Sequence, residues 1–219
     1  MTDDSRPTAE PLRLTTDDGL ALEAEWVWPG APTALVVLAH PHPLHGGSMR
    51  SLVTSELFRS LPGRGVAALR FNFRGVEGSE GTHGEGLTER LDVEAAIDAL
   101  AAGAATRRIV GVPLVLAGWS FGGDVSLTVT SPALSGWVLI APPLRLVHRD
   151  RMVAATDPRP KLLVVPEHDQ FRDPASAAEV VADWANTELD VVAGGDHFLA
   201  GRTDRVVDQL VAFCGRLRT

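Results

Sequence analysis

The amino-acid sequence predicts an α/β domain with a mostly parallel central sheet and helices on both of its faces. Short apolar runs alternate along the chain with stretches of helical periodicity, which is the order of elements in a parallel sheet with crossover helices. Several runs are apolar without interruption, as strands covered on both sides are. At 219 residues, 45% of them hydrophobic, the chain can bury one substantial core.

Seven segments have the pattern of strands. Residues 20–28 alternate apolar and charged side chains, which is typical of an edge or half-buried strand. The other six are nearly unbroken apolar runs, and they span residues 34–39, 66–71, 113–117, 137–141, 161–165 and 189–192. Ahead of them, residues 1–11 are expected to form a flexible tail, and residues 12–219 one domain.

Five helices are expected between and after these strands. The first has one apolar face, with Ser48 in front of it as the expected cap; the face consists of Met49, Leu52, Val53, Leu57 and Leu61. The other four cover residues 91–102, 121–130, 174–184 and 205–217. The 19 residues from 142 to 160 are too few for a large lid domain between the two strands that they connect.

The composition argues against several classes of protein. The 20 Lys and Arg residues and 28 Asp and Glu residues give a formal net charge of −8, which does not suit a nucleic-acid partner. No apolar run approaches the roughly 20 residues that cross a bilayer, and no secretory signal pattern is visible, so we expect no membrane association and a cytoplasmic location. The single cysteine, Cys214, excludes an intramolecular disulfide.

The segment Gly118-Trp119-Ser120-Phe121-Gly122 carries the strongest functional signal. It follows the apolar run at 113–117 and precedes a predicted helix, which is the pattern of a sharp turn that presents a nucleophile. Such a turn holds the serine in a backbone conformation that few residues tolerate, and a side chain at either glycine would collide with the adjoining strand or helix. The pattern therefore predicts Ser120 as a nucleophile.

A serine hydroxyl is a weak nucleophile unless a base takes its proton, so the prediction requires a histidine and a group that orients it. We expect His197 to be the base, because it lies in a glycine-rich loop directly after the last predicted strand. Asp169 directly follows the strand at 161–165, so it shares the carboxyl edge of the sheet and is the expected orienting group. Glu167 and Asp173 are alternatives for that role.

The chain order Ser120, Asp169, His197 resembles that of the α/β-hydrolase superfamily. Residues 40–49 (HPHPLHGGSM) and 69–79 (LRFNFRGVEGS) are similar to segments of small lidless bacterial hydrolases of the dienelactone-hydrolase-like and carboxylesterase groups. The resemblance, which runs from about residue 34 to the C-terminus, implies an α/β-hydrolase fold with no large lid domain. Dienelactone hydrolases use a cysteine nucleophile, whereas this chain has Ser120, so their lactone substrate is not carried over.

The resemblance also implies an oxyanion hole, the pair of donors that binds the developing negative charge. In this superfamily one donor comes from the loop after the third strand and the other from the residue after the nucleophile. Pro41 and Pro43 have no N–H to donate, so the backbone N–H groups of His42 and Phe121 are the expected pair.

Three histidines near this loop suggest an alternative metal site. The spacing of His40, His42 and His45 approaches that of a binuclear zinc hydrolase, but Leu44 stands where that pattern needs an aspartate. No metal and no other cofactor is therefore expected, and the histidines are interpreted as local hydrogen-bonding or pocket-lining groups.

Two sets of polar residues, most of them arginines, are expected to have structural rather than catalytic roles. The residues leaving the strand at 66–71 are expected to tie down the glycine-rich loop at 75–86, although they could touch substrate: Arg70, Asn72 and Arg74. A solvated basic helix is expected to carry a second set, Arg145, Arg149 and Arg151, with recognition of a carboxylate or phosphate as the alternative.

The sequence thus predicts a serine hydrolase that cleaves small or accessible carboxylic esters through an acyl-enzyme intermediate. His45, Trp119 and Leu144 are expected to contact this small-molecule substrate, and the further wall residues are Leu146, Val147 and Met152. Acyl transfer, thioester hydrolysis or amide hydrolysis at the same site are alternatives, as is a non-catalytic binding protein on the same scaffold. The oligomeric state is not predicted.

Overall fold

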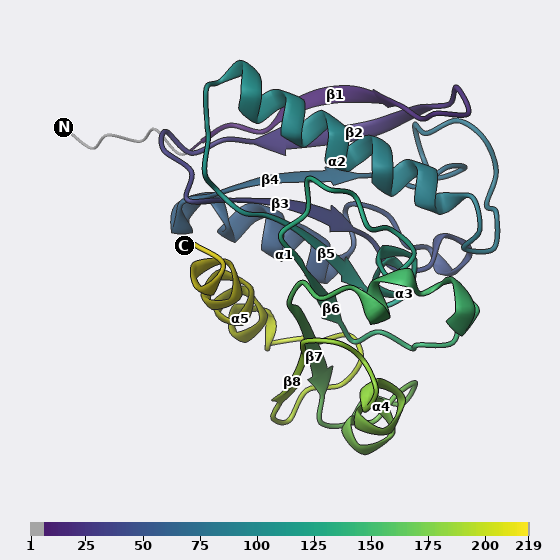
Figure 1. Cartoon of the computed structure of the whole chain (residues 1–219). Helices are drawn as coiled ribbons and strands as arrows, with labels where there is room; N and C mark the ends of the chain where they lie inside the picture. The colour runs from purple at the N-terminus through teal and green to yellow at the C-terminus, as the bar shows by residue number, and fades with distance from the viewer. Residues whose placement is uncertain (1–6, 219) are drawn as a thin grey trace.

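An eight-stranded sheet forms the centre of the computed structural model, which describes residues 7–218 (Figure 1). The strands are β1 (Glu10–Thr15), β2 (Ala21–Val27), β3 (Ala34–Ala39), β4 (Val66–Phe71), β5 (Leu114–Trp119), β6 (Gly136–Ile140), β7 (Lys161–Pro166) and β8 (Thr187–Val192). They follow the order β1-β2-β4-β3-β5-β6-β7-β8, in which β3 to β8 run parallel while β1 and β2 pair antiparallel. The mostly parallel sheet predicted from the sequence is confirmed.

Helices cover both faces of the sheet (Figure 1). One face carries α1 (Leu52–Ser60) and α5 (Thr203–Arg216), and the other carries α2 (Glu89–Thr106), α3 (Phe121–Ser126) and α4 (Pro174–Val181). Successive side chains of a strand point to opposite faces, so a strand between two helical layers must be apolar at every position. In β3, Val37 packs in the core on the α2 side, whereas Val36 and Leu38 pack on the α1 side.

The N-terminal edge of the sheet differs from the prediction. Residues 1–6 of the expected tail lie outside the described residues, and its last two residues, Glu10 and Pro11, are the first two of strand β1. The sequence does not predict β1 because only Leu12 and Leu14 alternate there with polar residues, which is too short a pattern to identify a strand. Proline is tolerated in such a position because an edge strand needs fewer backbone donors.

Two helices also begin or end away from the predicted residues. Ser51, not Ser48, precedes the first turn of α1, and the Ser48 hydroxyl instead accepts a hydrogen bond from the Arg50 N–H in the turn ahead of the helix. Helix α3 ends at Ser126 rather than near residue 130. These boundaries depend on local turn geometry, which apolar periodicity does not record.

The connection between β6 and β7 contains loops and two 3-10 helices, η3 (Arg149–Arg151) and η4 (Val153–Thr156). No large lid therefore covers the carboxyl edge of the sheet within residues 7–218. In the same part of the chain, no helix combines the length and the apolar character that crossing a membrane requires.

His40 ties the end of β3 to the chain that follows β4. Its buried ring accepts a hydrogen bond at Nε2 from the Phe73 N–H (3.0 Å) and donates from Nδ1 to the Pro41 carbonyl (2.6 Å). Burial lowers the pKa of His40 to about 3, so the ring stays neutral near neutral pH and keeps a lone pair for the Phe73 donor. This side chain thus sets the spacing between the loops that follow β3 and β4.

The polar residues at the end of β4 bond to carboxylates of neighbouring elements. The partners are Glu25 for Arg70, Glu23 and Glu77 for Asn72, and Asp18 and Asp92 for Arg74. Asn72 therefore ties down the glycine-rich loop at 75–86 through Glu77, as expected from the sequence, whereas the carboxylate partners of Arg70 and Arg74 lie outside that loop.

We expect His40→Ala to lower the free energy of unfolding by about 3 kcal/mol near neutral pH, because it deletes a buried ring and leaves the Phe73 N–H without its acceptor. The loss should shrink toward about pH 4. The pKa of His40 is about 3 in the folded chain and 6.5 ordinarily, so between these values the unfolded chain binds more protons and the wild-type protein loses stability as the pH falls. Urea unfolding at both pH values measures the effect.

The matched control is His148→Ala, which removes a side chain that is 74% exposed. It should change the free energy of unfolding by less than about 0.5 kcal/mol at either pH. A loss in His40→Ala that is equal at the two pH values would contradict a buried neutral ring at this position.

Candidate active site

Ser120 occupies the sharp turn between β5 and α3. Its backbone angles are φ 54° and ψ −120°, in a region that non-glycine residues seldom adopt, and its N–H continues the sheet by donating to the Ile140 carbonyl (2.9 Å). A Cβ added to Gly118 would lie 2.2 Å from the Gly122 carbonyl oxygen, and one added to Gly122 would lie 2.4 Å from the Ala39 carbonyl oxygen. The flanking glycines therefore allow the close backbone approach that the turn requires.

Three side chains from three strand ends form one hydrogen-bonded series. His197 Nε2 lies 2.9 Å from Ser120 Oγ, and His197 Nδ1 lies 2.9 Å from Asp169 Oδ2. All three residues are buried to more than nine-tenths, so the bonds are shielded from competing water. This arrangement can carry a proton from the hydroxyl to the imidazole while the carboxylate fixes the ring tautomer.

Each member of this series is held by further contacts. Asp169 Oδ1 accepts hydrogen bonds from the N–H groups of Phe171 (2.8 Å) and Arg172 (3.2 Å), which leaves Oδ2 aimed at the imidazole. The Trp119 indole donates to the His197 carbonyl (3.2 Å), and the Phe171 ring packs 4.4 Å from the imidazole centre. The ring of His197 is therefore fixed on both its polar and its apolar sides.

The alternative carboxylates serve other purposes. Glu167 accepts a hydrogen bond from the Gly194 N–H (2.7 Å), and Asp173 caps helix α4 by accepting from the Ser176 N–H (3.0 Å). Neither contacts the imidazole, so of the three candidates only Asp169 is placed to orient His197.

The expected oxyanion donors come from two separate segments of the chain. His42 follows Pro41 in the loop after β3, and Phe121 is the first residue of α3. Among residues 7–218, no group accepts a hydrogen bond from the backbone N–H of either residue. The ring of His42 packs 4.8 Å from that of Phe121 and is partly buried, and this burial lowers the pKa of His42.

A cavity of about 620 Å³ opens above Ser120 and His197. Two of the three expected substrate contacts, His45 and Trp119, line it, as does Leu146. Leu144 does not: its side chain is buried in the core on the α2 side, because a backbone φ of 56° turns the chain at this residue. Two other expected wall residues, Val147 and Met152, also pack in that core rather than in the cavity.

Asp124 positions one wall of the cavity and is not singled out by the sequence. This fully buried carboxylate, in the first turn of α3, accepts hydrogen bonds from the N–H groups of Leu144 (2.8 Å), Arg145 (2.9 Å) and Leu146 (2.8 Å). Burial raises the pKa of Asp124 to about 6. An acidic residue four positions after the predicted nucleophile is the signal that could have drawn attention to it.

Two aromatic residues of the cavity rim are also missed by the sequence interpretation. Phe171 and Phe198 line the cavity and remain 42% and 53% exposed. Their positions, two residues after Asp169 and one residue after His197, are the only sequence signal for them. Of the histidines considered as metal ligands, His40 is buried in the fold and lies off the cavity wall, and no group of three His, Cys, Asp or Glu side chains within residues 7–218 is arranged to hold a metal ion.

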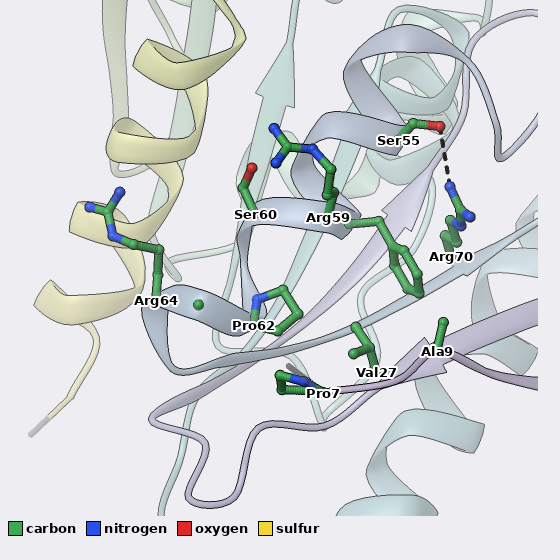
Figure 2. Close-up of a pocket in the computed structure, with 11 residues that line it drawn as sticks. Pro7, Ala9, Val27, Ser55, Arg59, Ser60, Pro62, Arg64 and Arg70 are labelled. Carbon is green, nitrogen blue, oxygen red and sulfur yellow. Dashed lines mark hydrogen bonds between the residues drawn. The ribbon is translucent and has the colours of Figure 1, made fainter. Parts of the chain in front are cut away.

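A second cavity, of about 690 Å³, lies between α1, β2 and the turn before β4 (Figure 2). Its arginines already have partners: Arg64 bonds to Asp208, Arg59 to Glu56, and Arg70 to Glu25 and to the hydroxyl of Ser55. Its lining includes Ser55 and Ser60 but no histidine that could activate them. This second cavity therefore has no counterpart of the hydrogen-bonded series at Ser120.

Comparison with known proteins identifies the family and the fold of the chain. Residues 32–210 match the family model of the alpha/beta hydrolase domain. The uncharacterized protein RP471 of Rickettsia prowazekii is 30% identical over 185 residues, which cover 80% of this chain and 75% of that protein. The structure of an alpha-beta serine hydrolase homologue from Coxiella burnetii is similar with a TM-score of 0.77 at 27% identity, covering 93% of this chain and 96% of that one. XC6422 from Xanthomonas campestris, a serine hydrolase without lid, shares the fold with a TM-score of 0.79 at 24% identity, covering 95% and 94%.

We expect Gly122→Ala to destabilise the protein by about 3 kcal/mol or more, because the new Cβ would lie 2.4 Å from the Ala39 carbonyl oxygen and 2.6 Å from that of His40. Gly215→Ala is the matched control, since this glycine lies in α5 with open space around its Cβ position. It should stabilise the protein by about 0.5–1 kcal/mol through helix propensity. Equal effects of the two substitutions in thermal unfolding would contradict the close approach at the turn.

Proposed function

The chain belongs to the alpha/beta hydrolase domain family, and on this premise we propose that it is a serine hydrolase that cleaves small carboxylic esters. The observation that carries the proposal is the hydrogen-bonded series of Ser120, His197 and Asp169 at the mouth of a cavity. The likeness to a serine hydrolase homologue of 27% identity supports it. A cytoplasmic location and a single domain over residues 12–219 remain predictions from the sequence.

The first half of the reaction forms an acyl-enzyme. Ser120 Oγ attacks the carbonyl carbon of the ester while His197 Nε2 takes the hydroxyl proton. The Asp169 carboxylate accepts a hydrogen bond from His197 Nδ1–H and stabilises the imidazolium. The N–H groups of His42 and Phe121 donate hydrogen bonds to the carbonyl oxygen as it becomes negative. When the tetrahedral intermediate collapses, His197 gives its proton to the leaving oxygen, and the alcohol departs.

The second half releases the acid. A water molecule gives a proton to His197 and attacks the carbonyl carbon of the acyl group on Ser120. The same donors stabilise the second oxyanion, and the serine is restored when the imidazolium returns the proton. If an alcohol or thiol replaced water, the same groups would perform acyl transfer, so product analysis with competing acceptors separates hydrolysis from transfer.

Ser120→Ala should lower kcat/KM for p-nitrophenyl acetate or butyrate by about 10⁴-fold or more and abolish labelling by a fluorophosphonate probe, because no other group can form the acyl-enzyme. The matched control is Ser55→Ala, which removes the hydroxyl that lines the second cavity. It should leave both activity and labelling unchanged. Full labelling of the Ser120→Ala protein would remove this serine from its proposed role.

Asp169→Asn should reduce kcat by about 10³- to 10⁴-fold with little change in KM, since the amide cannot hold the imidazole in the required tautomer or stabilise its charged form. The controls are Glu167→Gln and Asp173→Asn, which alter the neighbouring carboxylates; asparagine can still cap a helix at residue 173. Both controls should keep kcat within about threefold of the wild-type value. A larger loss in Glu167→Gln than in Asp169→Asn would assign the orienting role to Glu167 instead.

A further inference from the structure

The wall of the Ser120 cavity carries a single arginine, Arg145, and no lysine, aspartate or glutamate among the described residues that line it. The sequence interpretation placed Arg145 on a solvated basic helix, with recognition of a carboxylate or phosphate as the alternative. In the structure only Arg149–Arg151 form a helical turn, and Arg145 precedes it in the loop that borders the cavity.

The backbone of Arg145 is fixed while its side chain is available. The Arg145 N–H donates to the buried Asp124 carboxylate (2.9 Å), so the residue is anchored to the helix that begins at the nucleophile. Its side chain is exposed, and within residues 7–218 no carboxylate lies within ion-pair distance of its guanidinium. Arg149, four residues later, bonds instead to Asp183 (2.8 Å).

Apart from Arg145, the cavity is lined by the polar residues His42, His45 and Ser51 and by a set of exposed apolar side chains. Leu52, Phe171 and Phe198 line it and are 46%, 42% and 53% exposed. A substrate body of hydrocarbon or aromatic character would cover these side chains and release the water on them. The cavity therefore combines an apolar surface with one cation.

The overall charge of −8 opposes the approach of an anion, so the local cation must outweigh it. At physiological ionic strength charges are screened over about 8 Å, and none of the described residues that line the cavity is acidic. A guanidinium in direct contact with a carboxylate is screened much less and offers two parallel donors to it. The attraction between Arg145 and an anion in direct contact with it therefore outweighs the repulsion from the overall negative charge.

We propose that the substrate is an ester with an apolar body and a negatively charged group, a carboxylate in the simplest case, and that Arg145 binds this group. The inference rests on the proposed function, since it assigns a substrate class to the Ser120 cavity. Arg145 would determine specificity and would take no part in the proton transfers. Its effect should therefore fall on the charged substrate and leave a neutral one unchanged.

Two matched pairs of esters test this inference. One pair is mono-p-nitrophenyl glutarate and its neutral methyl ester, and the other is 4-(butyryloxy)benzoate and its methyl ester, so the carboxylate lies on the acyl side in one pair and on the alcohol side in the other. Arg145→Ala should lower kcat/KM about tenfold for the charged member of at least one pair and change the neutral member less than about twofold. Arg151→Ala, which removes an exposed arginine outside the cavity lining, should change neither.

Charge reversal and added salt distinguish an electrostatic role of Arg145 from a packing role, because packing alone would not make the preference for charged esters depend on either. Arg145→Glu should lower kcat/KM for the charged esters below that of Arg145→Ala, and added salt should erode the preference of the wild-type protein but not that of Arg145→Ala. If Arg145→Ala affects charged and neutral esters equally, or if Arg151→Ala matches it, the inference is wrong. Cleavage of the neutral esters in that case would leave the proposed function intact.

A binding measurement keeps the two proposals distinguishable. If the wild-type protein cleaves no ester of either pair, the proposed function fails, and titration of the Ser120→Ala protein with hexanoate and with hexanamide still tests the anion site. Hexanoate should bind more tightly than hexanamide, and adding Arg145→Ala should remove the difference. Equal binding of the two ligands to the Ser120→Ala protein would overturn the anion site.

Discussion

The site depends on the close contact between the ends of β3 and β5 and the first turn of α3. Gly118 pairs with Ala39 in the sheet, and Gly122 approaches the carbonyl oxygen of the same Ala39 so closely that no side chain fits. This contact forces Ser120 into its positive φ and directs its hydroxyl away from the sheet. The free-energy cost of the strained backbone at Ser120 is small compared with the stabilisation gained by burying the strands that impose it.

Parallel strands bring the other groups to the same edge. Asp169 follows β7 and His197 follows β8, and because β5 to β8 are neighbours in parallel register, their carboxyl ends open onto one surface. The imidazole must then reach back across two strands to Ser120. It does so from a loop to which the Trp119 indole donates a hydrogen bond, so the last residue of β5 helps to place the imidazole of His197 against Ser120.

The sequence predicts the parts of the fold and site that follow from strict patterns. The buried strands β3 and β4 are located to the residue, because strands covered on both faces are apolar throughout. Ser120 is predicted because the turn demands glycines at fixed positions, and Asp169 and His197 are predicted because each directly follows a predicted strand. The edge strand β1, the inward turn of Leu144 and the clamp at Asp124 are not, since each depends on contacts between segments far apart in the chain, which no local pattern encodes.

Buried polar groups anchor the loops around the cavity in place of a lid. Neutral His40 holds the chain after β4 to the end of β3, Asp169 holds the turn after β7, and Asp124 holds the loop after β6 through three backbone donors. Leaving a buried polar group without its hydrogen-bond partners costs free energy, so each loop is held in place by the group that its backbone satisfies. Because Asp124 lies in the first turn of α3 and its N–H donates to the Ser120 carbonyl, the wall that bears Arg145 keeps a fixed relation to Ser120. An open cavity can in this way select its substrate without a covering domain.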